Sequence, residues 1–279
     1  MDKKKFVALS PLNPRGKFMT AGQLSVKELF TENARFQAYL DVEVALAKAQ
    51  AKLNVIPGAA ASVISEKANL EKLDLKNIKE GLAKTGHPLV PLIWELDRVC
   101  GPKAGGYIHW GATTQNITQT GKLLLVKQCH DHFLVQMADL LCIFSELAFK
   151  TKNYVMAGRT HGQHAVPATF GYKIAVWIDE FIRHTDRLKG SEERVFVTML
   201  GGGAGTMASV GMEGLKTQEL MAQELGMHSM QMPSRTIGDH LTEYITLLAM
   251  LSATSSKIAR EVYTLMKQEF GELEEPVPI

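Results

Sequence analysis

The sequence predicts an all-α protein, and three observations support this fold class. A seven-residue repeat of apolar positions runs from Ile237 to Leu265, broken only at Ser255. Between Phe133 and Ala148, apolar residues recur at spacings of three and four, as they do on one face of a helix. No segment alternates apolar and polar residues between hairpin turns, so at most a short β-ribbon is expected.

The expected long helices follow one another along the chain. The first covers Ala34–Leu53, which is rich in Ala, Leu, Lys and Glu, and Thr31 and Asn33 precede it as candidate caps. A further helix is expected at Ala168–Leu188. The last covers Ile237–Leu265, where the repeat is typical of a helix packed in a bundle or a coiled coil.

The chain is expected to form two helical domains. Shorter amphipathic pieces precede residue 110 and long helices follow it, which indicates a smaller N-terminal domain, 1–110, and a long-helix bundle domain, 111–279. A chain of 279 residues can bury a sizeable core. The net charge of +2 gives no reason to expect nucleic acid as a partner.

The composition favours a soluble protein of the cytoplasm. No window approaches 18 uninterrupted apolar residues, so no membrane span is expected. The basic start, MDKKKF, lacks the apolar stretch of a signal peptide. Three cysteines without a CxxC pair argue against a disulfide framework and favour a reducing compartment.

Polar loops that contain glycine interrupt the helical sequence at four places. They are TGHPLVP (85–91), HWGATTQNITQTG (109–121), GRTHGQHAVPATFG (158–171) and GGGAGTMAS (201–209). The first three combine small residues and hydroxyls with a histidine, as at His87, Thr113, Thr114 and His161. Hydroxyls and backbone N–H groups at a helix N-terminus suit a carboxylate, and a histidine can move protons near neutral pH. From spacing alone, these loops are equally explained as capped helix starts.

Other chemistries find less support in the sequence. His161 and His164 have a usable spacing for a metal, but no cysteine or acidic cluster completes the set and HExxH is absent. GGGAGT fits neither phosphate-binding glycine motif, and no strand is expected before it. This segment is either a turn with a close backbone approach or the lining of a ligand pocket. No GxSxG occurs, and the cysteines lack a catalytic context.

The polar loops, in this order, resemble the signature regions of the fumarase/aspartase superfamily, in its adenylosuccinate lyase and 3-carboxy-cis,cis-muconate cycloisomerase branch. FTENARFQAYLDVEVALAKAQAKLNVIP resembles the first long helix of that branch, IHWGATTQNITQTG its first signature and GRTHGQHAVPATFG its second. GGGAGTMAS and LMKQEFGELEEP are closer to the cycloisomerase side. The resemblance runs from about residue 30 to the last residue.

The resemblance implies an all-α fold in which the central helices of four chains form one large bundle. It therefore implies a homotetramer whose active sites combine residues from three chains, and this would cover the Ile237–Leu265 repeat. It also implies that GRTHGQHAVPATFG is a bend between bundle helices that lines the active site. Neither a metal nor a cofactor is expected. The adenylosuccinate lyase side of the branch would place the chain in purine biosynthesis.

The reaction implied is β-elimination from a succinyl-type substrate with release of fumarate. Carried over by motif, His161 is the general acid, His87 assists on the far side of the substrate, and Thr113 and Thr114 bind a carboxylate. Asn116 stands where an aspartate is common in the family. The remaining residues expected to bind substrate are Gln115, Asn116, Arg159, Thr160 and Gln163.

The third signature of the family, GSSxMPxKxNP, is expected just after Ile279 and carries the serine base. We therefore expect the 279 residues alone to form an incomplete bundle and not to catalyse. A C–N lyase like adenylosuccinate lyase is the first interpretation, and a carboxymuconate-type cycloisomerase is the alternative. A helical oligomeric scaffold without activity is the alternative outside enzymes.

Overall fold

The computed structural model describes residues 25–234 and 236–274, and these are mostly helical, as predicted. The basic start and the last five residues lie outside the described residues. The chain forms two compact units, each built from separate stretches. In described residues, the first unit contains 132–191 and 241–274, and the second contains 25–131, 192–234 and 236–240. The expected division into domains 1–110 and 111–279 stays a prediction.

The second unit is built around the first long helix, α3. Its start agrees with the prediction, because Oγ1 of Thr31 accepts a hydrogen bond from the amide of Ala34 at 3.3 Å, whereas Asn33 lies inside the helix. Tyr39, Leu40 and Leu46 of α3 are almost fully buried in the core of this unit. The helices that begin and end within the unit are α2 (Val26–Leu29), α3 (Glu32–Lys52), α4 (Gly58–Lys67), η1 (Leu70–Lys72), α5 (Leu75–Thr85), α6 (Val90–Cys100), η2 (Gly105–Tyr107), η3 (Gly211–Glu213) and α9 (Gly214–Leu225).

A strand precedes the glycine-rich loop, contrary to expectation. β3 (Val197–Thr198) pairs in parallel with β4 (His228–Ser229). The pairing joins only two positions of each strand, Val197 with His228 and Thr198 with Ser229. A strand of two residues cannot show the alternation by which strands are recognised in a sequence, and this is why it was missed.

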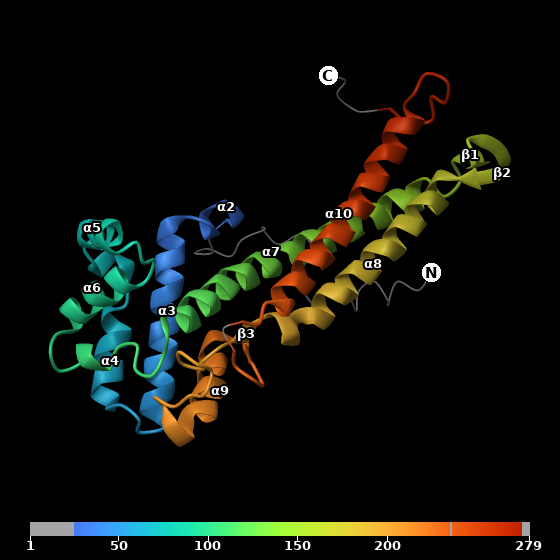
Figure 1. Cartoon of the computed structure of the whole chain (residues 1–279). Helices are drawn as coiled ribbons and strands as arrows, with labels where there is room; N and C mark the ends of the chain where they lie inside the picture. The colour runs from blue at the N-terminus through green and yellow to red at the C-terminus, as the bar shows by residue number, and fades with distance from the viewer. Residues whose placement is uncertain (1–24, 235, 275–279) are drawn as a thin grey trace. The chain divides into compact units, whose positions relative to one another are not determined.

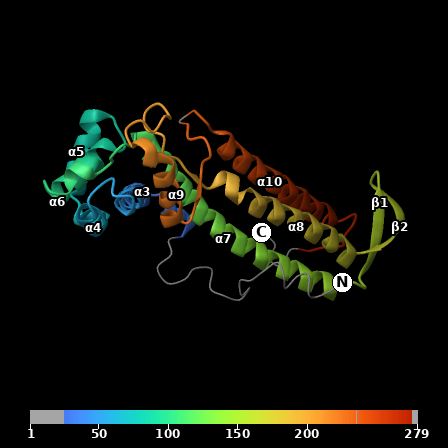
Figure 2. The same ribbon diagram turned by 90° about the horizontal axis from the view of Figure 1, so that it is seen from below.

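Long helices packed side by side form the first unit, as Figures 1 and 2 show. They are the part of α7 (Thr114–Lys150) that follows Asp131, together with most of α8 (Phe170–Val195) and of α10 (Asp239–Leu265). The helix expected over Ile237–Leu265 is thus confirmed from Asp239 on. Met137, Ile174, Trp177, Phe181 and Leu251 are buried where these helices meet. Nε2 of His184 lies 2.9 Å from Oγ1 of Thr254 and joins α8 to α10.

The segment GRTHGQHAVPATFG connects the bundle helices α7 and α8, as expected, and it does so as a β-hairpin. β1 (Val155–Thr160) and β2 (Gln163–Thr169) pair antiparallel, and Thr160 lies opposite Gln163. His161 and Gly162 form the turn, with φ of 50° and 74°, as in the two-residue turns typical of hairpins. The usual signal for such a turn is Asn-Gly or Asp-Gly. His-Gly was therefore not recognised.

Helix α7 is unusually apolar for its length. Among the described residues, it is the one helix that could cross a membrane by length and composition, with a mean hydropathy of 1.4 over its most apolar 18-residue window. Only 11% of that window is buried. Counting uninterrupted apolar residues missed this feature, because scattered polar residues break the run. A helix in the core of a helical assembly can have the same apolar composition as a membrane-spanning helix. The expectation that the protein has no membrane partner therefore stays a prediction.

Candidate active site

The polar loop before α7 enters the helix through two left-handed residues, His109 with φ 61° and Gly111 with φ 72°. A Cβ on Gly111 would lie 2.5 Å from Cγ2 of Val210, so glycine alone fits there. The helix begins at Thr114 and runs for 37 residues. Part of the predicted loop 109–121 is therefore helix, and Thr113 and Thr114 lie where its first turn begins.

Asn116 holds the start of α7 in place. Its side chain is fully buried, and its Oδ1 accepts hydrogen bonds from the amides of Thr113 at 3.0 Å and Gly202 at 3.1 Å. The contact with Thr113 is the backward-reaching half of a capping box. Gly202 belongs to the glycine-rich loop, where a Cβ would lie 3.4 Å from the carbonyl oxygen of Gly111. The two loops thus pass close together, which favours the close-approach interpretation of GGGAGT.

The start of α7 presents two hydroxyl donors that are without a partner in the described part of the chain. Thr113 and Thr114 are half-buried, and neither hydroxyl has a hydrogen-bond partner among the residues described. Nε2 of Gln115 donates to Oε1 of Gln119 at 3.4 Å. The first amides of a helix have no acceptor within it, and the helix dipole adds positive potential there. This turn can therefore bind an anion such as a carboxylate.

Two buried polar residues of α3 bind the same loop, and sequence reasoning missed both. Glu43 Oε1 lies 2.6 Å from Nδ1 of His109, and Glu43 Oε2 accepts from the amide of His109 at 3.1 Å. Gln50 Nε2 donates to the carbonyl oxygen of Trp110 at 2.8 Å. Burial alone would lower the pKa of His109, but the hydrogen bond and the charge of Glu43 outweigh it and raise that pKa. The available signal was a glutamate inside the apolar run DVEVALA.

His87 caps helix α6. Its Nδ1 accepts hydrogen bonds from the amides of Leu89 and Val90, each at 3.2 Å. With Nδ1 used as an acceptor, the proton of the neutral ring lies on Nε2. The structure thus supports the interpretation of this loop as the capped start of a helix. It leaves Nε2–H as the hydrogen-bond donor that His87 can offer.

The hairpin of the first unit carries the other predicted residues. His161 is exposed at its turn, next to Thr160 and Gln163 on the two strands. Arg159 is bound to Glu272, because its Nη1 and Nη2 each donate to that carboxylate at 2.8 Å. The hydrogen bond from Arg159 is the largest cause of a lowered pKa of Glu272, and burial opposes it. Sequence reasoning assigned Glu272 no role.

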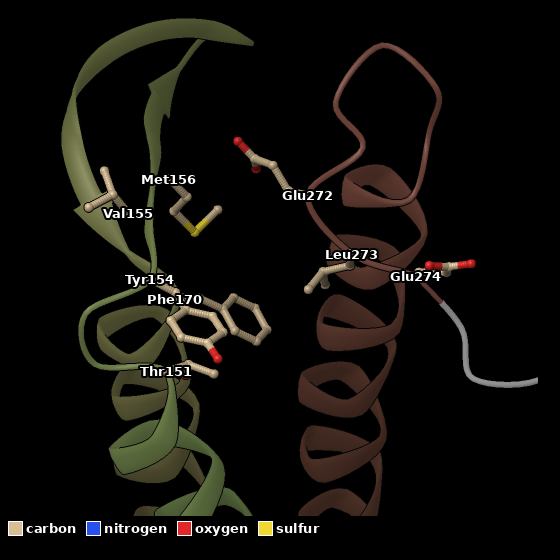
Figure 3. A pocket seen from close by; sticks show the side chains of 8 residues that line it. All are labelled: Thr151, Tyr154, Val155, Met156, Phe170, Glu272, Leu273 and Glu274. Carbon is tan, nitrogen blue, oxygen red and sulfur yellow. The ribbon is translucent and has the colours of Figure 1, made fainter.

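A cavity of about 500 Å³ lies at the base of the hairpin, as Figure 3 shows. Side chains from the hairpin side and from the segment after α10 face each other across it. The lining is largely apolar and contains none of the predicted site residues. It consists of Thr151, Tyr154, Val155, Met156, Phe170, Glu272, Leu273 and Glu274.

The predicted residues thus fall into two groups, one in each unit. The second unit holds Thr113, Thr114, Gln115 and Asn116 together at the start of α7, and His87 at the start of α6. The first unit holds Arg159, Thr160, His161 and Gln163 on the hairpin. Within the described part of the chain, no group of three or more His, Cys, Asp or Glu could hold a metal ion.

Comparison with known proteins identifies the family. The model of the Lyase_1 family, described as lyase, matches residues 24–279. The chain is 39% identical over 256 residues to N-acetyl-S-(2-succino)cysteine lyase of Dickeya dadantii, covering 91% of this chain and 56% of the relative. It is 38% identical over 255 residues to adenylosuccinate lyase of Methanocaldococcus jannaschii, covering 91% and 55%. The chain therefore spans about half the length of these curated relatives.

Solved structures give the same result. A fumarate lyase from Mesorhizobium sp. BNC1 superposes with a TM-score of 0.85 at 35% identity, over 92% of this chain and 62% of that one. The 3-carboxy-cis,cis-muconate lactonizing enzyme from Pseudomonas putida superposes with a TM-score of 0.82 at 30% identity, over 88% and 57%. The chain belongs to the Lyase_1 family of the fumarase/aspartase superfamily and has the all-α fold of that group.

Proposed function

We propose that the full-length protein catalyses β-elimination from a succinyl-type substrate and releases fumarate. The observation that supports this most directly is the pair of hydroxyls at Thr113 and Thr114, which have no hydrogen-bond partner among the described residues and lie at the start of α7. A succinyl group carries two carboxylates, and this turn suits one of them. The relatives named for a succinyl compound, at 39% and 38% identity, support the substrate class.

The proposed chemistry is an elimination assisted by charge stabilisation. A base removes a proton from the carbon next to one carboxylate, and the electron pair is delocalised onto that carboxylate as an aci-carboxylate. It then forms the carbon–carbon double bond as the bond from the adjacent carbon to the leaving atom breaks. Hydroxyl and amide donors fixed in advance stabilise the negative charge on the carboxylate, and this is the role we give to Thr113 and Thr114.

The proton for the leaving atom comes from His161, which acts as general acid. Its neighbours Thr160 and Gln163 orient the substrate. The Nε2–H of His87 donates a hydrogen bond to the side of the substrate that faces away from His161. Gln115 and Asn116 act at the start of α7, where Asn116 holds the turn. Arg159 binds Glu272 through both terminal nitrogens. We therefore assign Arg159 to holding the hairpin and not to substrate.

The leaving atom in our first choice is nitrogen, as in adenylosuccinate lyase. A relative at 39% identity is named for an S-(2-succino) thioether, so sulfur is the second leaving atom to test. The alternative reaction is a carboxymuconate-type cycloisomerisation, favoured by the TM-score of 0.82 to the lactonizing enzyme and by the HWGATTQ segment. We further propose that the protein is a homotetramer of the cytoplasm.

The test is a substrate panel on the purified full-length protein. It contains adenylosuccinate, N-acetyl-S-(2-succino)cysteine and 3-carboxy-cis,cis-muconate, with release of fumarate or formation of a lactone followed by absorbance and NMR. We expect fumarate from a succinyl compound. A lactone as the sole product would replace the elimination by the cycloisomerisation. Turnover of none of them, with no binding of fumarate, would favour the helical scaffold and contradict the proposal.

A further inference from the structure

We propose that Glu43 is a positioning residue for the reaction, because its buried carboxylate sets the course of residues 109–113. In this way it fixes where Thr113 enters the first turn of α7. The proposal rests on the proposed function, in which this turn binds a substrate carboxylate. Glu43 itself has no contact with substrate in this scheme.

The burial of Glu43 demands an explanation. Its side chain is 1% exposed, and its neighbours along α3, Val42, Leu46 and Ala47, belong to the apolar core of the second unit. A carboxylate in such surroundings is strongly unfavourable unless it is paired and hydrogen-bonded. Both of its oxygens are satisfied by one residue of the loop, since Oε1 meets the ring of His109 and Oε2 accepts from its amide.

A second side chain of α3 binds the next residue of the loop. Gln50 follows Glu43 by seven residues, which is two helical turns and places both on one face of the helix. Gln50 is fully buried and donates to the carbonyl oxygen of Trp110 at 2.8 Å. One face of α3 thus holds two consecutive residues of a loop that is otherwise made of small and polar residues.

The backbone of His109 shows what these contacts accomplish. Its φ of 61° lies in the left-handed region, which is uncommon for a residue with a side chain and is stabilised here by its surroundings. A carboxylate that binds both the ring and the amide of one residue restrains its side-chain and backbone torsions together. The turn at His109, followed by the left-handed Gly111, then directs the chain to Thr113. Misplacement of a substrate-binding group by about 1 Å can cost about a hundredfold in rate.

The experiment compares Glu43→Gln with Glu95→Gln in the full-length protein. Glu95 is a matched control, because it is a buried carboxylate of the same unit that accepts from the amide of Asp74 and pairs with Arg98, away from this loop. Gln50→Met, which keeps the side-chain shape, is the second variant in case Glu43→Gln does not fold. The measurements are the affinity for fumarate, kcat and KM for the succinyl substrate, unfolding in urea, and amide exchange at residues 109–116.

We expect Glu43→Gln to speed amide exchange at residues 109–116 and to weaken fumarate binding and raise KM about tenfold or more. Glu95→Gln should lose comparable stability and leave fumarate binding unchanged. Equal fumarate affinity in the two variants would overturn the proposal and make Glu43 a purely structural ion pair. If the wild-type protein neither binds fumarate nor acts on a succinyl compound, the proposed function fails instead. In that case the positioning role can still be refuted, by amide exchange at residues 109–116 that is as slow in Glu43→Gln as in the wild type.

Discussion

Arg159 and Glu272 form a bidentate ion pair that joins the β-hairpin to the segment after α10. Each terminal nitrogen of Arg159 donates to the carboxylate at 2.8 Å, and the guanidinium lies 4.6 Å from the ring centroid of Phe270. The two side chains are only 16% and 21% exposed, so water screens the pair less than it would at the surface. The two residues are 113 positions apart in the sequence, so the ion pair is a long-range contact that holds the hairpin against the segment after α10.

We predict that Arg159→Lys destabilises the hairpin by about 1–2 kcal/mol, because lysine cannot reproduce the planar fork. Amide exchange along β1 and β2 measures the effect. Glu80→Gln is the control, since its pair with Lys76 is 3.9 Å long, with side chains that are 82% and 55% exposed, and should contribute little. An Arg159→Lys hairpin that exchanges as slowly as wild type would contradict the prediction.

The same pair should make the hairpin sensitive to acid. The hydrogen bond from Arg159 lowers the pKa of Glu272, whereas burial acts in the opposite direction. A lowered pKa in the folded state gives stability that is present above the ordinary carboxyl pKa and is lost as pH falls through the folded value. We expect hairpin exchange to accelerate in that acid range in the wild type and to be flat in Glu272→Gln. Identical acid profiles for the two proteins would exclude Glu272 as the cause.

The side-chain oxygen of Asn116, which accepts hydrogen bonds, should contribute more to stability than its side-chain NH2 group. Asn116→Ala leaves the amides of half-buried Thr113 and buried Gly202 without their partner, and we predict a loss of about 2–3 kcal/mol in urea unfolding. Asn116→Asp keeps the acceptor at the start of a helix, where a negative charge is favourable, and should lose clearly less near neutral pH. A larger loss in the aspartate variant would show that the amide group of Asn116, which has no partner among the described residues, is needed.

Two glycines of α8 should respond in opposite directions to alanine. A Cβ on Gly171 would lie 2.7 Å from both Cα and N of Lys152, and backbone cannot move aside as a side chain can. We therefore predict that Gly171→Ala costs about 1–3 kcal/mol or more through overpacking. A Cβ on the exposed Gly190 meets nothing within 4 Å, and Gly190→Ala should gain about 0.5–1 kcal/mol of stability. Urea unfolding of both variants checks the pair, and equal signs would contradict the packing argument.

The helices could be predicted from the sequence because their signals are local. The repeat of Ile237–Leu265 has the apolar spacing of a helix face, the run Ala34–Leu53 is rich in residues that favour a helix, and the structure has α10 and α3 there. The hairpin could not be predicted in the same way. Its turn uses His-Gly, and β2 is largely exposed, so it has no buried face to produce an alternation of apolar and polar residues.

The sequence could name only some residues of the candidate site, and the roles of those residues stay predictions. Thr113, Thr114 and His161 stand in motifs that can be read along the chain. Glu43 binds a loop residue 66 positions away and Glu272 binds a strand residue 113 positions away, and nothing local marks a carboxylate as the partner of a distant histidine or arginine. Such pairs are created by packing and become visible only in the folded chain.

His161 should be tested with a substitution that respects its backbone. Its φ of 50° means that alanine adds strain, whereas asparagine tolerates the left-handed region and cannot donate a proton as an acid. We predict that His161→Asn lowers kcat for the succinyl substrate about 10²–10⁴-fold with little change in KM, as for a lost general acid. His164→Asn, on the neighbouring exposed position, is the control and should keep its kcat. An unchanged kcat in His161→Asn would remove His161 from the catalytic residues.

The last prediction concerns the apolar surface of the first unit. Large apolar side chains are more than 60% exposed on all three of its long helices, at Ile143, Phe149, Tyr172, Ile245 and Tyr263. Exposed apolar surface of this extent marks an interaction site in a protein that stays in solution. Partner helices from other copies of the chain would cover it, as the proposed homotetramer requires. Partition into lipid is the competing explanation for so apolar a helix as α7.

We predict that the full-length protein sediments as four chains and that Ile143→Lys combined with Ile245→Lys shifts it to smaller species. A lysine on each of two helices places charge where an apolar contact would form, and burying an unpaired charge is strongly unfavourable. Met212→Lys is the control, because Met212 is 98% exposed in the second unit and lies outside these helices. It should sediment like the wild type. A wild-type protein that is monomeric at every concentration, or that floats with lipid vesicles instead of assembling, would contradict the prediction.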